Sequence, residues 1–117
     1  MNHIKRQAII ASLFTDCLDE CDRKGQDYAV HNGTEKEIDS LSNFKSIASM
    51  LGSNITKYTV WYVYFAKHIH AITTFITTGK LESEGIKGRI IDAINYLAIL
   101  HCMLEEDQEE EKHEQRY

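Results

Sequence analysis

Proline is absent from this chain of 117 residues, and only six residues are glycine. These two residues supply most tight turns, so their scarcity disfavours a sheet with many turns and favours a few long helices. Apolar runs are short as well, and none approaches the roughly 20 residues that a membrane-spanning helix needs. The segment 1–6 also lacks the basic, apolar and small-residue order of a signal peptide. We therefore expect one all-α domain without a membrane partner.

Basic residues do not form a stripe anywhere along the chain. The net charge is −5. Segment 105–117 holds seven acids and two bases, a balance of −5, and the remaining 11 acids and 11 bases cancel. Duplex nucleic acid needs a basic surface, so it is not expected as a partner, whereas one small nucleotide is compatible with this charge. We divide the chain into a helical domain, 1–104, and an acidic C-terminal extension, 105–117.

Cysteine occurs three times, an odd number that does not suit a disulfide framework and indicates the reducing cytoplasm. Cys17 and Cys21 are one helical turn apart, and with His101 and Cys102 they could hold zinc if their helices were adjacent. The spacing matches no recognised zinc pattern, and free cysteine is a common core residue. We therefore predict no metal and no cofactor.

Apolar residues recur at helical spacing in four segments, and this period predicts helices. They span residues 4–24, 41–51, 57–78 and 86 to at least 104. Gly25 is expected to end the first helix before a loop, Thr56 to cap the third and Gly79 to end it. A short turn makes the last two helices antiparallel neighbours. The predicted fold is all-α, a four-helix bundle-like domain with one short helix and a long central helical hairpin.

The start of the long helix, 60–66, is apolar nearly all round. It contains most of a cluster of five aromatic residues, which are Tyr58, Trp61, Tyr62, Tyr64 and Phe65. Such a cluster can form the core of the chain or a subunit interface, where aromatic residues are enriched. A helix that lacks a polar face in so short a chain favours the interface. We predict a homo-oligomer that assembles through this half of the helix.

Polar side chains with recognisable chemistry occur on both helices of the predicted hairpin. A forked donor, an acceptor, an amide and a ring are the groups that nucleotide sites use for phosphate, base edge and base stacking. The alternatives are a core histidine held by one hydrogen bond and an exposed Arg89–Asp92 ion pair of little energy. Both interpretations stay open. The candidate ligand-binding residues are Lys67, His68, Arg89, Asp92, Asn95 and Tyr96.

Short motifs between Gly25 and Leu100 give a second indication. In chain order they are Asp27-Tyr28, Leu41-Ser42-Asn43-Phe44, Lys67-His68, Glu82-Ser83-Glu84, and Gly88-Arg89 followed by Asp92-Ala93-Ile94-Asn95-Tyr96. This order resembles a group of small phage and prophage proteins. It is similar to the nucleotide-modification-associated domains of phages, which show an Asp-Tyr, a Lys, an Arg and an Asp-x-x-Asn-Tyr. The resemblance implies a helical phage or prophage protein linked to nucleotides, and it adds Asp27, Tyr28 and Asn43 to the candidate ligand-binding residues.

Three functions are compatible with these features. The first is an oligomeric protein that binds a small nucleotide or nucleotide-derived signal without turnover and, in a phage setting, withdraws a host defence signal in the host cytoplasm. The second is a metal-dependent enzyme, because the chain also resembles the all-α nucleotide pyrophosphohydrolases, although their paired acidic metal motif is missing. The third is a protein-interaction module without a ligand. We expect the first, with no catalytic residue.

Overall fold

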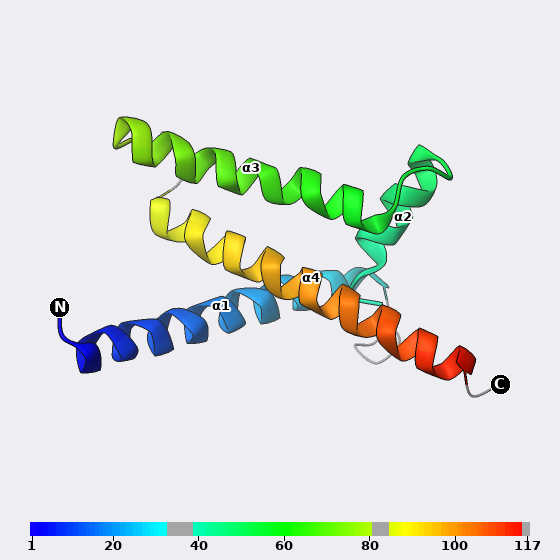
Figure 1. The fold of residues 1–117 in the computed structure, drawn as a ribbon, viewed down its shortest axis with the longest axis horizontal. Coiled ribbons are helices and arrows are strands. Elements are labelled where there is room, and N and C mark those ends of the chain that lie inside the picture. The colour runs from blue at the N-terminus through cyan, green and yellow to red at the C-terminus, as the bar shows by residue number, and fades with distance from the viewer. Residues whose placement is uncertain (33–38, 81–84, 116–117) are drawn as a thin grey trace.

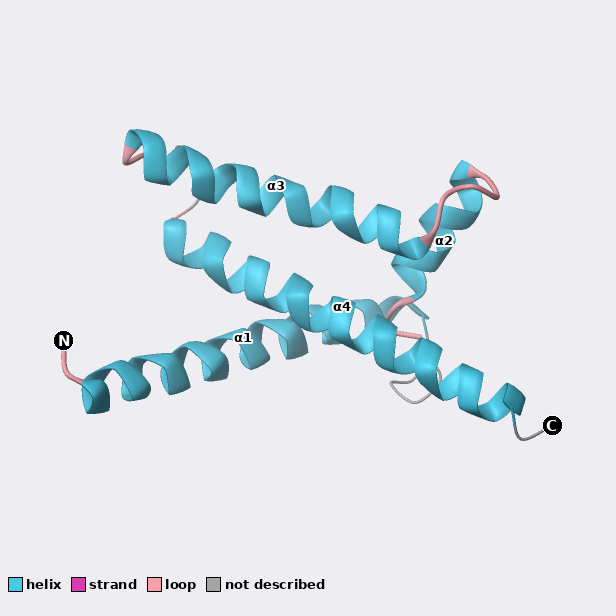
Figure 2. Ribbon diagram, viewed as in Figure 1, coloured by secondary structure: helices cyan, strands magenta, loops and turns pink. Residues whose placement is uncertain are grey.

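The computed structural model describes residues 1–32, 39–80 and 85–115, without the side chains of 25–32 and 115. This part of the chain contains four helices and no strand (Figure 2). The predicted all-α class with one short helix is confirmed. None of the described helices combines the length and the apolar character that crossing a membrane requires. The helices are α1 (His3–Asn32), α2 (Ser42–Leu51), α3 (Lys57–Thr78) and α4 (Ile86–Gln115).

The hairpin of α3 and α4 forms the frame of the molecule (Figure 1). Its two helices run side by side in opposite directions, as the short connection between them predicts. The short helix α2 packs against α3, and α1 packs against α4. The start of α1 projects away from the hairpin, and residues 1–12 are all exposed. Helix α4 therefore contacts both a hairpin partner and α1.

Local sequence explains where α3 begins and ends. The Thr56 hydroxyl accepts a hydrogen bond from the backbone N–H of Thr59 at 3.3 Å. At the other end Gly79 adopts φ 73°, and its backbone N–H donates to the carbonyl oxygen of Phe75 at 2.7 Å. A left-handed residue closes the last helical turn, and glycine adopts that conformation without steric cost. Both predicted caps are confirmed.

Helix α1 differs from the prediction at its C-terminal end. It continues past Gly25 to Asn32, so the predicted helix end is wrong and most of the predicted loop is helical. A glycine inside a helix costs only about 1 kcal/mol relative to alanine, and it ends a helix only if the chain turns left-handed there. Ion pairs from Lys24 to Glu20 and to Asp92 hold the helical turn that precedes this glycine.

The core forms where α2 meets the hairpin. Met103 of α4 is fully buried there. The Trp61 indole N–H donates to the carbonyl oxygen of Tyr96 at 2.6 Å, and the Phe65 ring stacks on Trp61 with centroids 4.8 Å apart. Part of the aromatic cluster therefore fills the core of the chain itself, whereas Tyr62 is 64% exposed. The buried core residues are Leu41, Phe44, Ala48, Val60, Trp61 and Met103.

The acidic segment after Leu104 continues α4 without a break. Two of its acids, Glu106 and Asp107, are held by cations from other helices. Lys57 Nζ lies 2.5 Å from an Asp107 carboxylate oxygen, and Lys45 Nζ lies 2.7 Å from a Glu106 carboxylate oxygen. The hydrogen bond from Lys57 is the largest cause that lowers the pKa of the Asp107 carboxyl. These contacts offset the unfavourable interaction of acids with the negative end of the helix dipole.

Candidate functional site

The hairpin brings three of the predicted site residues into contact. Arg89 Nη1 of α4 lies 3.3 Å from His68 Nδ1 of α3, and Asp92 Oδ2 lies 3.8 Å from the same nitrogen. Asp92 Oδ1 in turn lies 3.4 Å from Lys24 Nζ of α1. We call the series Arg89, His68, Asp92 and Lys24 the polar chain. It connects three helices, and its His68 and Asp92 side chains are mostly shielded from water, whereas Lys24 is 54% exposed.

The polar chain fixes the protonation of its histidine. An arginine side chain can only donate hydrogen bonds, so His68 Nδ1 is the acceptor and the imidazole is neutral with its proton on Nε2. Burial is the largest cause that lowers the pKa of His68, and Arg89, Lys67 and Lys24 lower it further, while Asp92 raises it. The net direction is downward, so His68 stays neutral near pH 7.

Two predicted site residues are part of the packed interior. Asn95 is 9% exposed. The Tyr96 ring lies 5.0 Å from the His68 ring and 6.4 Å from both the Tyr64 and the Phe44 rings, measured between centroids. The ring that the sequence assigns to base stacking is therefore already in contact with rings from α3 and α2. A base would stack on Tyr96 only after displacing one of them.

The remaining predicted residues are more distant from this arrangement or cannot be placed. Lys67 is exposed on α3, next to His68 in the chain. Asn43 is exposed at the start of α2, and its neighbour Phe44 is the residue that reaches Tyr96. The side chains of Asp27 and Tyr28 lie outside the described residues.

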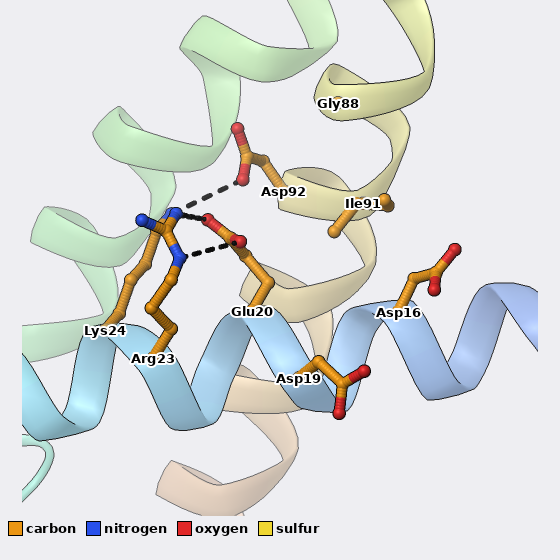
Figure 3. Close-up of a pocket in the computed structure, with 8 residues that line it drawn as sticks. All are labelled: Asp16, Asp19, Glu20, Arg23, Lys24, Gly88, Ile91 and Asp92. Atoms are coloured by element: carbon orange, nitrogen blue, oxygen red, sulfur yellow. Dashed lines mark hydrogen bonds and ion pairs between the residues drawn. The ribbon is translucent and has the colours of Figure 1, made fainter.

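An open groove of about 600 Å³ lies between α1 and α4, beside the polar chain (Figure 3). Asp92 and Lys24 belong to both. The other groove residues were not predicted from the sequence. A signal was present, because Glu20 lies three residues before Arg23 and four before Lys24, and this spacing indicates a charged face of α1. The groove is lined by Asp16, Asp19, Glu20, Arg23, Lys24, Gly88, Ile91 and Asp92.

The cations of the groove are paired with carboxylates but are not buried. An Arg23 nitrogen lies 2.5 Å from a Glu20 carboxylate oxygen, and Lys24 Nζ lies 3.8 Å from the same oxygen. The hydrogen bond from Arg23 is the largest cause that lowers the pKa of Glu20.

Comparisons of the chain with protein-family models, with curated proteins and with solved structures gave no match. The site is therefore interpreted from its own geometry.

The thiols do not gather into a metal site in the described part of the chain. Cys17 is buried, Cys21 half-buried and Cys102 exposed. Burial is the largest cause that raises the pKa of both Cys17 and Cys21, so these two thiols stay protonated and behave as small apolar residues. Within the same described ranges, no three His, Cys, Asp or Glu side chains are arranged to hold a metal ion.

The lowered pKa of His68 predicts a dependence of stability on pH. Between the ordinary histidine pKa of 6.5 and the lower value in the fold, the unfolded chain binds more protons than the folded chain. The contribution of His68 to the free energy of unfolding should therefore be fully present above pH 6.5, and it should decrease as the pH drops below that value. Urea unfolding of the parent and of His68→Gln between pH 7.5 and 5 measures this, and the variant should have the flatter profile.

Other titrating groups make the His68 prediction easy to contradict. The lowered pKa values of Glu20, Asp39 and Asp107 affect stability at lower pH, below their ordinary values of 4.5 and 3.8. They are common to both proteins and cancel in the comparison. Equal slopes for the parent and the variant between pH 6.5 and 5 would show that His68 is not held neutral by the fold.

Proposed function

We propose that this protein binds a small nucleotide-like anion where the polar chain meets the groove between α1 and α4, and that it holds the ligand without turnover. The observation that carries the proposal is the bridging position of Asp92. This carboxylate contacts Lys24 of α1 on one side and lies near His68 and Arg89 of the hairpin on the other. A groove of about 600 Å³ beside it falls within the range of small-molecule sites.

The charges of the groove set the binding mode. Four carboxylates and two cations line it, so an anion is attracted only where cations are concentrated, at Arg23 and Lys24 of the groove and at Arg89 of the adjoining polar chain. Arg23 and Lys24 are 67% and 54% exposed, and ion pairs of such exposure are worth about 1 kcal/mol or less. A phosphate can therefore replace Glu20 or Asp92 as their partner at little cost, and charge-assisted bonds to phosphate are stronger than neutral ones.

The biological role follows from the phage resemblance. A protein that binds a nucleotide-derived signal tightly and does not change it lowers the free concentration of that signal. In a host cell infected by a phage, the consequence would be a weakened defence response. Binding without chemistry needs only donors, acceptors and a shaped groove, and the polar chain offers these.

A nucleotide panel tests the proposal. The full chain is titrated with nucleoside mono-, di- and triphosphates and with cyclic nucleotides, with the midpoint of thermal unfolding as the readout. At least one member should raise the midpoint, because a ligand that binds only the folded state stabilises it. The bound nucleotide should be recovered unchanged. Absence of any shift across the panel would contradict the proposal and favour the protein-interaction module.

The enzyme alternative has its own signature in the same experiment. The metal-dependent hydrolase would release phosphate or pyrophosphate steadily in Mg²⁺, and the release would stop on chelation and in Asp92→Asn. We expect no release above the background of the buffer. Steady release with both of these properties would replace the binding proposal by the enzyme.

A further inference from the structure

Helix α1 has a broad apolar surface, of which its own chain covers only one part. Leu13 and Cys21 are half-buried and Cys17 is buried, on the side that packs against α4. A second stripe lies beside this side, at intervals of four and three residues. All of its members are exposed, and Ile4, Phe14 and Leu18 reach 79%, 57% and 63%. The outer stripe consists of Ile4, Ala8, Ala11, Phe14 and Leu18.

The whole molecule is too open for a self-sufficient chain of its size. Its radius of gyration is 17.2 Å, whereas a compact domain of this length has about 13 Å. Its accessible surface is 9253 Å², whereas a folded monomer of this mass exposes roughly 6,500 Å². The difference exceeds the roughly 800 Å² that each partner contributes to a stable interface. The chain therefore has enough extra surface to form one.

We propose that the outer stripe of α1 binds the same stripe of a second copy of this chain, with the two helices antiparallel and the two-fold axis near Ala11. This inference does not depend on the proposed ligand. The axis position follows from the stripe itself, because Ala11 is midway between Ile4 and Leu18. Ile4 of one copy then meets Leu18 of the other at each end of the stripe. The small residues Ala8 and Ala11 at the centre let the helix backbones approach closely.

Charge decides the relative direction of the helices. Lys5 and Arg6 lie near the start of α1, and Asp16 and Asp19 lie near the other end of the stripe. A parallel pair would place each charge beside its own copy and repel. Asp16 and Asp19 line the groove with α4 and do not belong to the stripe, but an antiparallel pair still places the basic start of each helix at the level of the acidic part of the other, which favours this direction. A two-fold pair of this kind is closed and does not extend into a fibre.

The half-helix 60–66 offers less exposed apolar surface than the outer stripe of α1. Val60 and Trp61 are buried in the core of the chain itself, and Tyr62 and Val63 are the strongly exposed apolar residues left there. The contact surface proposed here therefore differs from the one that the sequence suggested. The outer stripe on α1 is longer, and all of its members are exposed.

Sedimentation equilibrium of the full chain tests the interface. The parent should have twice the 13.5 kDa mass of one chain at micromolar concentration. Phe14→Glu and Leu18→Glu should each raise the dimer dissociation constant roughly 100-fold or more, because the two-fold axis repeats each loss. Both side chains are exposed in the single chain, so helical circular dichroism should persist. Ile76→Glu on α3 is the matched control, since Ile76 is 75% exposed outside the stripe, and it should leave the mass unchanged.

Disulfide trapping then tests the direction of the helices, in a Cys102→Ser background. Ala11→Cys should link to its own copy on mild oxidation. Ile4→Cys should link only when mixed with Leu18→Cys, because an antiparallel pair separates the two copies of residue 4 by about 21 Å. A monomeric parent would overturn the interface. So would a dimer whose dissociation constant is unchanged by both Phe14→Glu and Leu18→Glu, or a dimer that Ile76→Glu dissociates equally. Self-linking of Ile4→Cys would overturn the antiparallel arrangement.

Discussion

Replacing Trp61 with alanine is expected to lower the free energy of unfolding by roughly 3–5 kcal/mol, the usual range for removing a buried aromatic side chain. The side chain is 6% exposed and belongs to the core cluster that joins α2 to the hairpin. Its indole N–H donates to the Tyr96 carbonyl oxygen, and its ring stacks on Phe65. The substitution therefore removes apolar contacts and a hydrogen bond together, and this weakens the packing of three helices against one another. Urea unfolding followed by circular dichroism measures the loss.

The adjacent residue provides the control for this substitution. Tyr62 is 64% exposed, so Tyr62→Ala should change the free energy of unfolding by about 0.5 kcal/mol or less. The two substitutions remove aromatic rings from neighbouring positions of one helix, and only burial distinguishes them. Similar losses for both would mean that α3 is rotated about its axis relative to this structure, or that Tyr62 is covered by another copy.

The sequence was sufficient for the helices whose ends are determined locally. Thr56 and Gly79 form the caps that their residue types indicate, because a hydroxyl acceptor and a left-handed glycine act within one helical turn. The connection near Gly79 is too short for anything but an antiparallel pair. The hairpin and the all-α class could therefore be predicted without any knowledge of the rest of the chain.

Helix α1 could not be predicted in the same way. Gly25 has a residue type that often ends helices, but the contacts of Lys24 with Asp92, 68 residues away, support the turn before it. A long-range contact of this kind has no local signal. The apolar period of α1 likewise indicates how wide the apolar surface is. It does not indicate that one half packs on α4 while the other half, with Phe14 and Leu18, stays exposed.

The candidate site was predictable in part for the same reason. His68, Arg89 and Asp92 meet because the antiparallel hairpin brings their levels together. Lys24 was missed because no pattern in α1 reveals which helix it will face. Tyr96 shows a further limit, since its place on a polar sector gave no sign that rings from α2 and α3 would surround it.

Charge reversal at Arg89 is expected to weaken nucleotide binding by roughly 100-fold or more. A hydrogen bond to a charged partner is worth about 1.5–3 kcal/mol, and each 1.4 kcal/mol is a tenfold change in affinity. Arg89→Glu replaces that attraction by repulsion and places a carboxylate near Asp92, next to the incoming phosphate. Titration calorimetry with the nucleotide that gives the largest thermal shift measures the change. The helical circular dichroism should stay, because Arg89 is half-buried at the hairpin surface rather than in the core.

Two further variants separate a direct phosphate contact from a general change of charge. Lys87→Glu makes the same charge reversal at an exposed position two residues earlier on α4, and it should weaken binding only slightly because exposed charges are screened. Arg89→Lys keeps the positive charge but removes the forked donor, and its affinity should lie between those of the parent and Arg89→Glu. If Arg89→Glu binds the nucleotide as well as the parent does, or if Lys87→Glu loses as much affinity as Arg89→Glu, the polar chain is not the phosphate site. The ion pairs at Asp92 would then serve only to hold α1 against the hairpin.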